Sequence, residues 1–538
     1  MNEVCGSERV KQVGGGSWAG IFSLFLFGLV VVVSACDSRE TGDESTGGTG
    51  GGNGEQQDTS SSGGDDSGSS GGGVDTSMVA ESTPGEQSNA ISEGLYVSLS
   101  GNDESGDGSE TNPYQHMQYV LDNLAGPGDA IILLEGTYEE PIRIRHDDFT
   151  LTAKEGAEVH LSCPVSIDEN DPILCVEIDA ETTGVTLRGL EVSGGFYSIF
   201  LGSQWDWDDS PQDNERAREI VIEDCVLHDS GRDVVKIPAG CDDVTIRRCE
   251  IYNSGMGYPE GTPAEEKNAE GIDAVNADRL KVQDCYIHDT ATTCVYIKGG
   301  SIGAVVERTR AERCGEMGIG IGFDTSPEWF DTQVNPEYYE SIGMVVRNNV
   351  VIDTHMAGIG LFGSKDAQVL HNTIIRAATG GHAALYFGLT YQDWDPEAKR
   401  PANTNPTIVG NVVDQADAPS TQCVAIRYAE EDGLGKLPAL TGPITMNHNL
   451  FWADLGCVFS DGRPDTLMEE GDFSAWQAHS VGADQDSLQT DPLLDETGHL
   501  TAGSPCIDVL SEPTAGVAYD VDREPRTAPF DLGADELQ

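Results

Sequence analysis

The chain has 538 residues and carries 30 Lys and Arg against 92 Asp and Glu, which gives a formal net charge of −62 at pH 7. A charge of this sign repels phosphate groups, so we exclude nucleic acid as a partner. A polyuronate or sulfated glycan is repelled as well unless a divalent cation bridges it to clustered carboxylates, although the acidity is equally consistent with a saline habitat.

The N-terminus has the pattern of an exported protein. Arg9 and Lys11 precede an apolar run at residues 19–33, and the run ends in VSAC, whose last residue is Cys36. The run is too short for a membrane-spanning helix, and a small-residue cleavage site follows it directly. We therefore predict a signal peptide at residues 1–35 and lipidation of Cys36. The lipid alone would hold the protein to a membrane of the cell envelope, and exposure at the cell surface is left open.

The following segments predict a tether and then a capped fold. Residues 36–92 consist mainly of Gly, Ser, Thr, Asp and Glu, which bury too little surface to offset the entropy of ordering, so we expect a disordered acidic linker. Residues 113–125 begin with Pro113 and have helical apolar spacing, which predicts a helix that closes one end of the fold. The apolar stripe of this helix consists of Met117, Val120, Leu121 and Leu124.

The middle of the chain repeats one pattern. The segments IVIEDCVLHDSGRDVVKI, VTIRRCEIYNSG, LKVQDCYIHDTATTCVYI and AVVERTRAERCGEMGIGI each contain short alternating runs joined by a turn. Aligning the repeats on the residue after the polar pair gives a column with steps of 24 residues, or more where a loop is inserted. One small or Asn side chain per step predicts a β-solenoid whose coils bury their apolar faces by stacking. The column is Gly189, Cys225, Cys249, Cys285, Thr309, Asn349, Thr373, Asn411 and Asn449.

With this column, the sequence resembles the right-handed parallel β-helix family, which includes pectate lyases, chondroitinase B and alginate lyases. The resemblance covers residues 93–481 and implies an all-β solenoid with the helix at 113–125 as its N-terminal cap. Residues 482–538 contain SPCID, DVD and DLGADE, and they resemble a C-terminal module that commonly follows such repeats. We expect a small cap with Asp-rich turns there rather than a calcium site, because Asp is common in turns.

Cysteine usage fits an exported protein. Without Cys5 of the signal peptide and the lipidated Cys36, eleven cysteines remain, so at least one cannot pair within the chain. Cys163 and Cys175 flank an insertion and predict a disulfide across a short loop. The three column cysteines should be buried free thiols rather than metal ligands, because a small apolar thiol packs well in a core. These are Cys225, Cys249 and Cys285.

Eleven residues after the column positions, a second set of strands carries candidate chemistry. The flanking apolar residues must point inward, so the middle residue of each strand points outward. Lys236, Asp273 and Tyr296 are then side by side on adjacent coils, about 4.8 Å apart. The ends of the same strands carry Asp233, Glu270 and Lys298. The outward column continues with Gly320 and Gly360, which predicts a bare groove floor.

Lyases of the resembled family use the outer face of this strand, where a Lys or Arg removes the proton next to a uronate carboxyl and an acidic cluster holds Ca²⁺. The resemblance therefore implies Lys236 as the catalytic base, Lys298 and Tyr296 as further catalytic candidates, and Ca²⁺ as a cofactor. The implied metal ligands are Asp233, Glu270 and Asp273. Without a cation these carboxylates raise the pKa of Lys236, whereas a base needs it lowered. The alternative is that Lys236 and Asp273 form an exposed cross-strand ion pair of little energetic value.

Three loops that leave the same corner of the solenoid combine tryptophan with carboxylates. They read QWDWDDSPQD at 204–213, DTSPEWFDTQVNPEYY at 324–339 and TYQDWDPEAKR at 390–400. Flat aromatic rings beside hydrogen-bonding acids suit the apolar face and the hydroxyls of a sugar, although the same rings can instead pack the loops onto the solenoid. The candidates for substrate binding are Trp205, Trp207, Trp329, Trp394 and Tyr391.

We therefore predict a monomeric, lipid-anchored polysaccharide lyase that acts by β-elimination on a polyuronate. Two alternatives remain open: a glycoside hydrolase with paired carboxylates from the tryptophan loops, and a non-catalytic glycan-binding or structural lipoprotein. A lyase makes an unsaturated product that absorbs in the near ultraviolet. A hydrolase makes reducing ends without that absorbance, and a binding protein makes neither.

Overall fold

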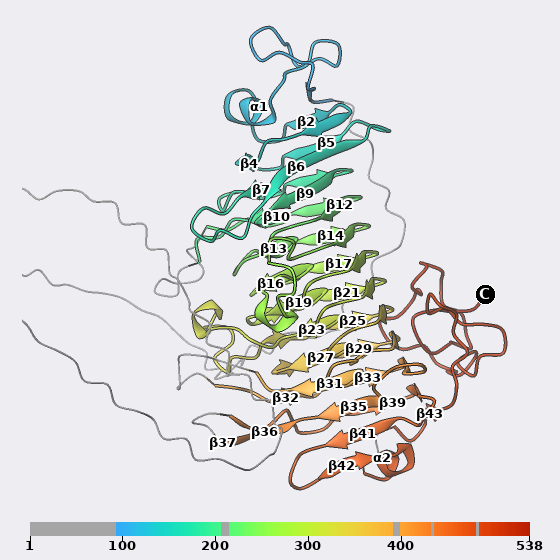
Figure 1. The fold of residues 1–538 in the computed structure, drawn as a ribbon. Coiled ribbons are helices and arrows are strands. Elements are labelled where there is room, and N and C mark those ends of the chain that lie inside the picture. The colour runs from blue at the N-terminus through green and yellow to red at the C-terminus, as the bar shows by residue number, and fades with distance from the viewer. Residues whose placement is uncertain (1–92, 206–214, 391–398, 432–434, 480–483) are drawn as a thin grey trace, which may run out of the picture. The chain divides into compact units, whose positions relative to one another are not determined.

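The computed structural model describes residues 93–205, 215–390, 399–431, 435–479 and 484–538. Within them the chain forms a parallel β-helix, in which each coil adds one short strand to each of three long sheets (Figure 1). Neighbouring strands pair in parallel, apart from the last pair in the third sheet, which is antiparallel. The predicted solenoid is therefore confirmed. Among the described residues no helix is both long and apolar enough to cross a membrane.

We number the three sheets by the order in which a coil visits them. The first sheet contains β1 (Leu95–Val97), β2 (Ala130–Leu133), β5 (Thr150–Ala153), β8 (Thr186–Arg188), β11 (Val221–Glu223), β14 (Thr245–Arg247), β17 (Lys281–Gln283), β21 (Val305–Glu307), β25 (Val345–Arg347), β29 (Gln368–Leu370), β33 (Thr407–Val409) and β39 (Thr445–Asn447). The second sheet contains β3 (Gly136–Tyr138), β6 (Val159–Val165), β9 (Glu191–Gly195), β12 (Val226–His228), β15 (Glu250–Tyr252), β18 (Tyr286–His288), β22 (Arg310–Glu312), β26 (Val350–Ile352), β30 (Thr373–Ile375), β34 (Val412–Asp414), β40 (Leu450–Trp452) and β43 (Leu488–Gln489). The third sheet contains β4 (Ile142–Ile144), β7 (Leu174–Ile178), β10 (Tyr197–Leu201), β13 (Val235–Ile237), β16 (Ile272–Val275), β19 (Val295–Lys298), β23 (Ile319–Ile321), β27 (Ile359–Phe362), β31 (Leu385–Gly388), β35 (Gln422–Ile426), β41 (Val458–Asp461) and β42 (Met468–Gly471).

Smaller elements lie at the corners and ends of the coils. A short fourth sheet follows the third, and β36 pairs with β37 as an antiparallel hairpin. The remaining elements are β20 (Ser301–Ile302), β24 (Ser341–Ile342), β28 (Ser364–Lys365), β32 (Asn403–Thr404), β38 (Leu440–Thr441), β36 (Tyr428–Glu431), β37 (Gly435–Pro438), the helices α1 (Met117–Asn123) and α2 (Phe473–His479), and the 3₁₀ turns Ala264–Glu266 and Pro327–Trp329.

The coils follow from the alternation of the strand triplets. In β14, for example, Ile246 is fully buried while Thr245 and Arg247 are partly exposed, so one apolar residue per triplet reaches the core. The corner between the first and second sheets is a single residue in the left-handed region, such as Asp224 with φ of 56° or Arg248 with φ of 55°. Such a residue turns the chain within one position, so the next strand of the coil can join the second sheet directly.

The inward column is confirmed, with two corrections of one residue. Cys225, Cys249 and Cys285 are buried free thiols on adjacent coils, as predicted. Asn372, not Thr373, continues the column, because the side-chain amide of Asn349 donates to Asn372 and that of Asn372 donates to Asn411. Leu190, not Gly189, holds the first position, since Gly189 has φ of 64° and forms the corner itself. The aligned steps are each one residue too long at these places, since Leu190 and Cys225 are 35 residues apart and Asn349 and Asn372 are 23 residues apart.

Helices close both ends of the stack. The predicted N-terminal helix is confirmed as α1, which buries Met117, Val120 and Leu121, but it begins four residues after Pro113 and leaves Leu124 40% exposed. At the other end, α2 packs Phe473 and Trp476 onto Phe451 and Phe459 of the last coil.

The C-terminal residues 490–538 lie against the side of the second sheet. Leu500, Leu510 and Leu532 pack with the outward residues Val412 and Leu450 of this sheet. In addition, the backbone N–H of Ala534 donates to the Thr373 hydroxyl. This segment therefore covers the apolar outward face that the second sheet has from β26 to β40 (Figure 1).

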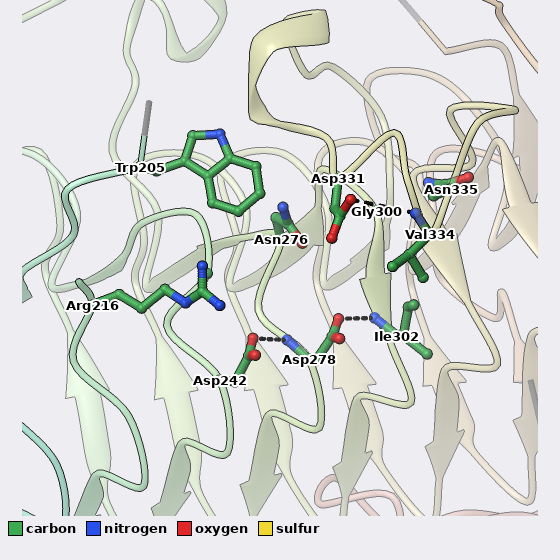
Figure 2. Close-up of a pocket in the computed structure, with 11 residues that line it drawn as sticks. Trp205, Arg216, Asp242, Asn276, Asp278, Gly300, Ile302, Asp331, Val334 and Asn335 are labelled. Atoms are coloured by element: carbon green, nitrogen blue, oxygen red, sulfur yellow. Dashed lines mark hydrogen bonds between the residues drawn. The ribbon is translucent and has the colours of Figure 1, made fainter. Parts of the chain in front are cut away.

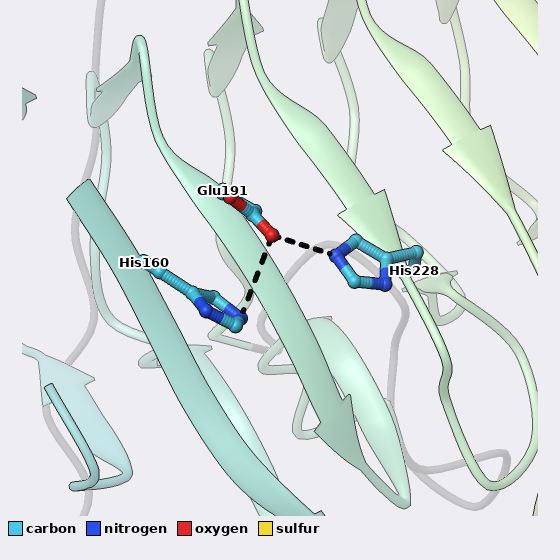
Figure 3. A group of neighbouring side chains, drawn as sticks. All are labelled: His160, Glu191 and His228. Atoms are coloured by element: carbon cyan, nitrogen blue, oxygen red, sulfur yellow. Dashed lines mark hydrogen bonds and ion pairs between the residues drawn. The ribbon is translucent and has the colours of Figure 1, made fainter. Parts of the chain in front are cut away.

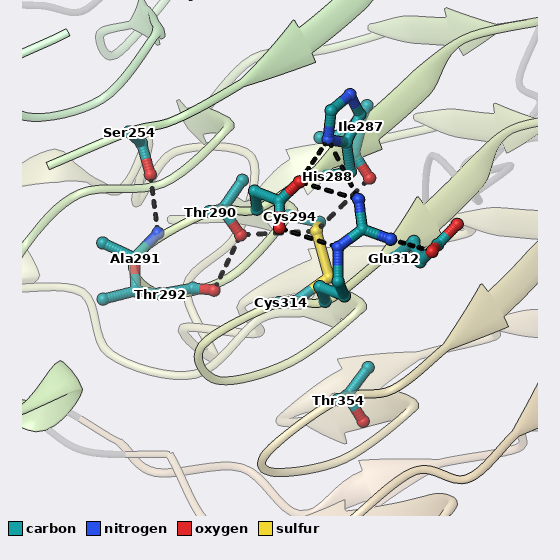
Figure 4. The surroundings of a disulfide bond; sticks show 12 residues. Ser254, Ile287, His288, Thr290, Ala291, Thr292, Cys294, Glu312, Cys314 and Thr354 are labelled. Carbon is teal, nitrogen blue, oxygen red and sulfur yellow. Dashed lines mark hydrogen bonds and ion pairs between the residues drawn. A yellow bond between two sulfur atoms is a disulfide. The ribbon is translucent and has the colours of Figure 1, made fainter. Parts of the chain in front are cut away.

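Three disulfides fasten the coils in the described part of the chain. The predicted Cys163–Cys175 bond is present, whereas Cys294–Cys314 and Cys423–Cys457 had no signal in the sequence. Cys294 directly precedes β19 and Cys314 follows β22, so this bond ties the coil that carries Tyr296 and Lys298 to the next corner (Figure 4).

Candidate functional site

The predicted row on the third sheet has the expected register. Lys236 of β13 pairs with Asp273 of β16, and Asp273 pairs with Tyr296 of β19. The structure thus brings together all six residues that the sequence placed on these three strands, and we call them the charged cluster. They are Asp233, Lys236, Glu270, Asp273, Tyr296 and Lys298.

The charged cluster is buried, although it lies on the outward side of the sheet. Asp233 is 0%, Asp273 2% and Glu270 6% exposed, while the side chain of Lys236 retains 19%. The Lys236 ammonium forms an ion pair with Asp273 and lies 3.6 Å from Asp233 Oδ2. The ion pair of the alternative interpretation is therefore present, but it is not an exposed one.

The three carboxylates lie close enough to share one cation. One oxygen of each of Asp233, Glu270 and Asp273 lies within 4.8 Å of the others. Asp233 Oδ2 and Asp273 Oδ1 are buried and accept no hydrogen bond. A buried carboxylate oxygen without a donor is costly, so Asp273 Oδ1 fits a bound cation, as does Asp233 Oδ2, which has only the Lys236 ammonium at 3.6 Å.

The cluster shifts the pKa values of its members in opposite directions. Burial, followed by the charges of Asp233 and Asp273, raises the pKa of Glu270 well above its usual value. Burial alone would raise the pKa of Asp273 and lower that of Lys236. The combined attraction of Asp273 and Asp233 for Lys236, and of Lys236 and Lys298 for Asp273, outweighs burial, so the pKa of Asp273 is lowered and that of Lys236 is raised. Lys236 is thus held as an ammonium, as the sequence predicted for a cluster without a cation.

Two further groups lie beside the cluster, the backbone N–H of Asp324 and the Glu340 carboxyl, which contacts Gly299 next to Lys298. The Lys298 ammonium lies 4.0 Å from the ring centroid of Tyr296, and the backbone N–H of Asp324 donates to the Tyr296 hydroxyl at 3.1 Å. Glu340 accepts hydrogen bonds from the Gly299 N–H at 2.9 Å and the Thr325 hydroxyl at 2.7 Å, and burial raises its pKa to about 8.

Sequence reasoning missed Glu340. It stands at the end of the 324–339 insertion, immediately before β24, and no strand register aligns it with the charged cluster. The only signal for it was its place in a loop that returns to the corner of the coil carrying Tyr296.

The predicted glycine groove floor is wrong. Gly320 and Gly360 are both buried. A Cβ added at Gly320 would lie 3.2 Å from the Met317 side chain, and one added at Gly360 would lie 2.7 Å from the Phe362 ring. These glycines make room for an apolar cluster that covers this part of the sheet. The apolar cluster consists of Met317, Ala357, Phe362, Ala383 and Tyr386.

Two of the tryptophan loops meet at the corner after the third sheet. The Trp205 indole N–H donates to the carbonyl of Glu328 at 2.8 Å, and the Asn276 side chain donates to the carbonyl of Trp329. Trp205 is half-buried, as the packing alternative expects, while Trp329 remains 36% exposed. Trp207, Tyr391 and Trp394 lie outside the described residues, so their predicted roles stay predictions.

Between these loops lies a small acidic cavity of about 60 Å³ (Figure 2). Asp242, Asp278 and Asp331 line it together with Trp205 and other residues. Burial, followed by the charge of Asp242, raises the pKa of Asp278 to about 6. Sequence analysis did not single out these acids, because they stand in turns where Asp is common.

Comparisons with known proteins agree with the coil architecture. A family model described as a right-handed beta helix region matches residues 175–335. No curated protein sequence matches the chain.

Solved structures of low sequence identity cover most of the chain. Pectate lyase Pel9A is 13% identical, covering 82% of this chain and 96% of its own with a TM-score of 0.46. XylC in complex with xylose is 10% identical, and the match covers 83% of this chain and 98% of XylC with a TM-score of 0.47. An alginate lyase from Paenibacillus sp. str. FPU-7 is 15% identical, and the match covers 70% of this chain and 95% of the lyase with a TM-score of 0.32. The matched family model and the parallel pairing of the coils identify a right-handed parallel β-helix.

Proposed function

We propose that the protein is a polysaccharide lyase that acts on an acidic extracellular glycan at the charged cluster. The observation that carries the proposal is the set of three buried carboxylates with two oxygens that accept no hydrogen bond, flanked by Lys236 and Lys298. Buried charges of this kind are a poor source of stability, so their presence favours a chemical role.

Ca²⁺ fits this group of residues. It prefers oxygen ligands, and Asp233, Glu270 and Asp273 offer six carboxylate oxygens, of which two accept no hydrogen bond. When bound there, the cation would neutralise the uronate carboxyl and compete with Lys236 for its acidic partners, which lowers the pKa of the lysine.

The residues of the chain then divide the elimination between them. A neutral Lys236 amine takes the proton from C5 of the uronate, the C4–O bond breaks, and a C4–C5 double bond forms. The Tyr296 phenol is positioned as an acid for the leaving oxygen. Burial raises its pKa, so it stays protonated, and its oxygen already accepts a hydrogen bond from Asp324 N–H, which leaves the phenol proton to donate. Lys298, beside Tyr296, would bind the substrate carboxylate.

The proposed location follows from the N-terminal segment. Cleavage before Cys36 and lipidation of that cysteine would tether the β-helix to the cell envelope through the linker at 36–92. A monomer tethered in this way would meet a polysaccharide outside the cytoplasm. Trp329, as an exposed ring at the adjacent corner, would support the sugar chain.

A second candidate is glycoside hydrolysis at the corner cavity. It is favoured by the pKa of Asp278, which at about 6 suits a general acid, and by the neighbouring Asp242 and Asp331. The cavity of about 60 Å³ holds a hydroxyl group or a few waters, which is small for a sugar ring.

A glycan screen tests both candidates. Pectin, alginate, chondroitin and neutral glycans are incubated with the protein with and without Ca²⁺, and ultraviolet absorbance and reducing ends are followed. Calcium-dependent absorbance on one acidic glycan is expected. Reducing ends without absorbance would favour the hydrolase, and binding without either product would overturn both enzymes.

A further inference from the structure

The outward face of the second sheet carries another group of metal-ligating side chains. His160 of β6, Glu191 of β9 and His228 of β12 come from three adjacent strands, and their side chains converge (Figure 3). This group lies on a different sheet from the charged cluster, and the proposed lyase does not use it.

The spacing of the three ligand atoms matches a coordination sphere. His228 Nε2 lies 3.2 Å and His160 Nε2 lies 3.8 Å from the same oxygen of Glu191, and all three ligand atoms lie within 4.8 Å of one another. Tetrahedral ligands at about 2.0 to 2.2 Å from a metal are separated by roughly 3.3 Å. The His228–Glu191 distance of 3.2 Å matches this separation, and the His160–Glu191 distance of 3.8 Å exceeds it by about 0.5 Å.

The hydrogen bonds of His228 leave a lone pair facing a carboxylate. Its Nδ1 lies 2.9 Å from Asp229 Oδ2, so Nδ1 is the donor and a neutral ring keeps its lone pair on Nε2. That lone pair faces the Glu191 oxygen, which is also an acceptor. Two acceptors at 3.2 Å need a cation between them, either a proton or a metal ion.

Asp229 also has the outer-sphere role that metal sites use. A carboxylate on the second nitrogen of a ligating histidine fixes the ring and increases its basicity. On His160, the Ser193 hydroxyl lies 2.7 Å from Nε2, the nitrogen that would bind the metal. Solvent reaches the group, since the side chains of His160 and Glu191 are 28% and 46% exposed.

We propose that His160, Glu191 and His228 bind a divalent transition metal of the zinc class. Two imidazoles and one carboxylate suit Zn²⁺ and its neighbours in the first transition row, whereas Ca²⁺ prefers oxygen ligands alone. Three protein ligands leave a fourth position for water. The ion would cross-link three successive coils.

The chain contains a matched pair that lacks the third ligand. His288 Nδ1 lies 2.6 Å from Asp289, and His288 Nε2 lies 3.2 Å from Glu250, which repeats the His228 arrangement. The strand neighbour of Glu191 on the preceding coil is His160, but that of Glu250 is Val226. His288 therefore provides a two-ligand control within the same sheet.

The test is a Co²⁺ titration of the full chain, purified in detergent and stripped with a chelator, with excess Ca²⁺ present to fill oxygen-only sites. Visible d–d absorption reports Co²⁺ bound to nitrogen ligands, and Zn²⁺ should displace it. Wild type and His288→Ala should bind Co²⁺ with equal affinity. Co²⁺ affinity should fall at least about tenfold in each of the ligand variants His160→Ala, His228→Ala and Glu191→Gln. It should also fall at least about tenfold in Asp229→Asn, because outer-sphere partners typically contribute 10- to 100-fold to metal affinity.

Folding of each variant is checked by circular dichroism without metal. Glu191 is largely exposed, so Glu191→Gln keeps the test valid even where a histidine variant does not fold. An equal loss in His288→Ala, unchanged affinity in Glu191→Gln, or no visible absorption in wild type would overturn the proposal and assign the shared cation as a proton.

Discussion

One outward column of the third sheet holds two regions of opposite chemistry. From β13 to β19 it carries the charged cluster, and from β23 to β31 it carries two glycines and then Tyr386 under the apolar cluster. The coils beneath both regions have the same alternation and the same register. The difference shows that the fold constrains only the inward residues, so an outward column is free either to add to the packing or to hold charges.

The two regions should differ in what they contribute to stability. Burial of Phe362 and Tyr386 removes apolar surface from water and stabilises the fold. Burial of Asp233, Glu270 and Asp273 carries a desolvation cost, which ion pairing outweighs at Asp273 but not at Glu270, whose pKa stays raised. We therefore attribute stability to the apolar cluster and function to the charged cluster.

The largest expected effect is on the apolar side. Phe362→Ala should lower the free energy of unfolding by about 3 to 5 kcal/mol, because the Phe362 ring is 2% exposed and fills the space above Gly360 and Gly388. Denaturant titration measures the change. Leu455→Ala, at a side chain that is 92% exposed, is the control and should shift it by at most about 0.5 kcal/mol. Equal effects of the two substitutions would contradict the role of the apolar cluster.

On the charged side, Lys236→Ala should reduce turnover at least about 10²-fold, because it removes the proposed base. Glycan binding should remain, and chelation of Ca²⁺ should abolish wild-type turnover as well. Lys281→Ala changes an exposed lysine of the first sheet and should have no effect on the ultraviolet assay. Retention of more than about a tenth of the activity in Lys236→Ala would assign the base elsewhere, with Lys298 next.

The inward column contains a similar contrast between thiols and amides. Asn411→Ala should cost about 1 to 3 kcal/mol, because it leaves Val369 O and the Asn449 side chain without their 2.9 and 3.0 Å hydrogen bonds. Cys249→Ala removes a thiol whose weak S–H donor lies 3.3 Å from Arg247 O, so its effect on the denaturation midpoint should be smaller. A larger loss of stability for Cys249→Ala than for Asn411→Ala would contradict this contrast between the thiols and the amides of the column.

Another expected effect is a change in the pH dependence of stability at Glu340. In the folded chain, burial raises its pKa from 4.5 to about 8. The stability it contributes is thus complete below pH 4.5 and is lost as the pH rises to about 8, with a slope of at most about 1.4 kcal/mol per pH unit. Glu340→Gln should reduce the slope of the unfolding free energy against pH in this window by up to about 1.4 kcal/mol per pH unit, which corresponds to one proton. An unchanged slope would contradict the raised pKa.

The sequence was sufficient to predict the coils and the register of the charged cluster. Triplets such as VKI and VYI place one residue outward by strand geometry alone, so Lys236, Asp273 and Tyr296 followed from counting. Errors of one residue arose at Gly189 and Thr373, because the coils from Leu190 to Cys225 and from Asn349 to Asn372 are each one residue shorter than the aligned steps.

What could not be predicted depends on loops that return from other coils. Burial of the charged cluster, the approach of Glu340 and the contact of Trp205 with Glu328 join segments whose separation no repeat defines. The same holds for the glycines, since Gly360 without its neighbours suggests an open floor, whereas the Phe362 ring two residues later fills it.

The most direct test of the contrast is the unfolding free energy of the double variant Lys236→Met and Asp273→Leu. It replaces the buried ion pair with apolar side chains of similar size, while Asp233 still accepts the 3.1 Å hydrogen bond from the Glu270 backbone N–H. We predict stability equal to wild type or higher by up to about 4 kcal/mol, together with loss of calcium-dependent stabilisation and of turnover. A loss of about 3 kcal/mol or more, like that of Phe362→Ala, would contradict the account, because the charged cluster would then be needed for the fold itself.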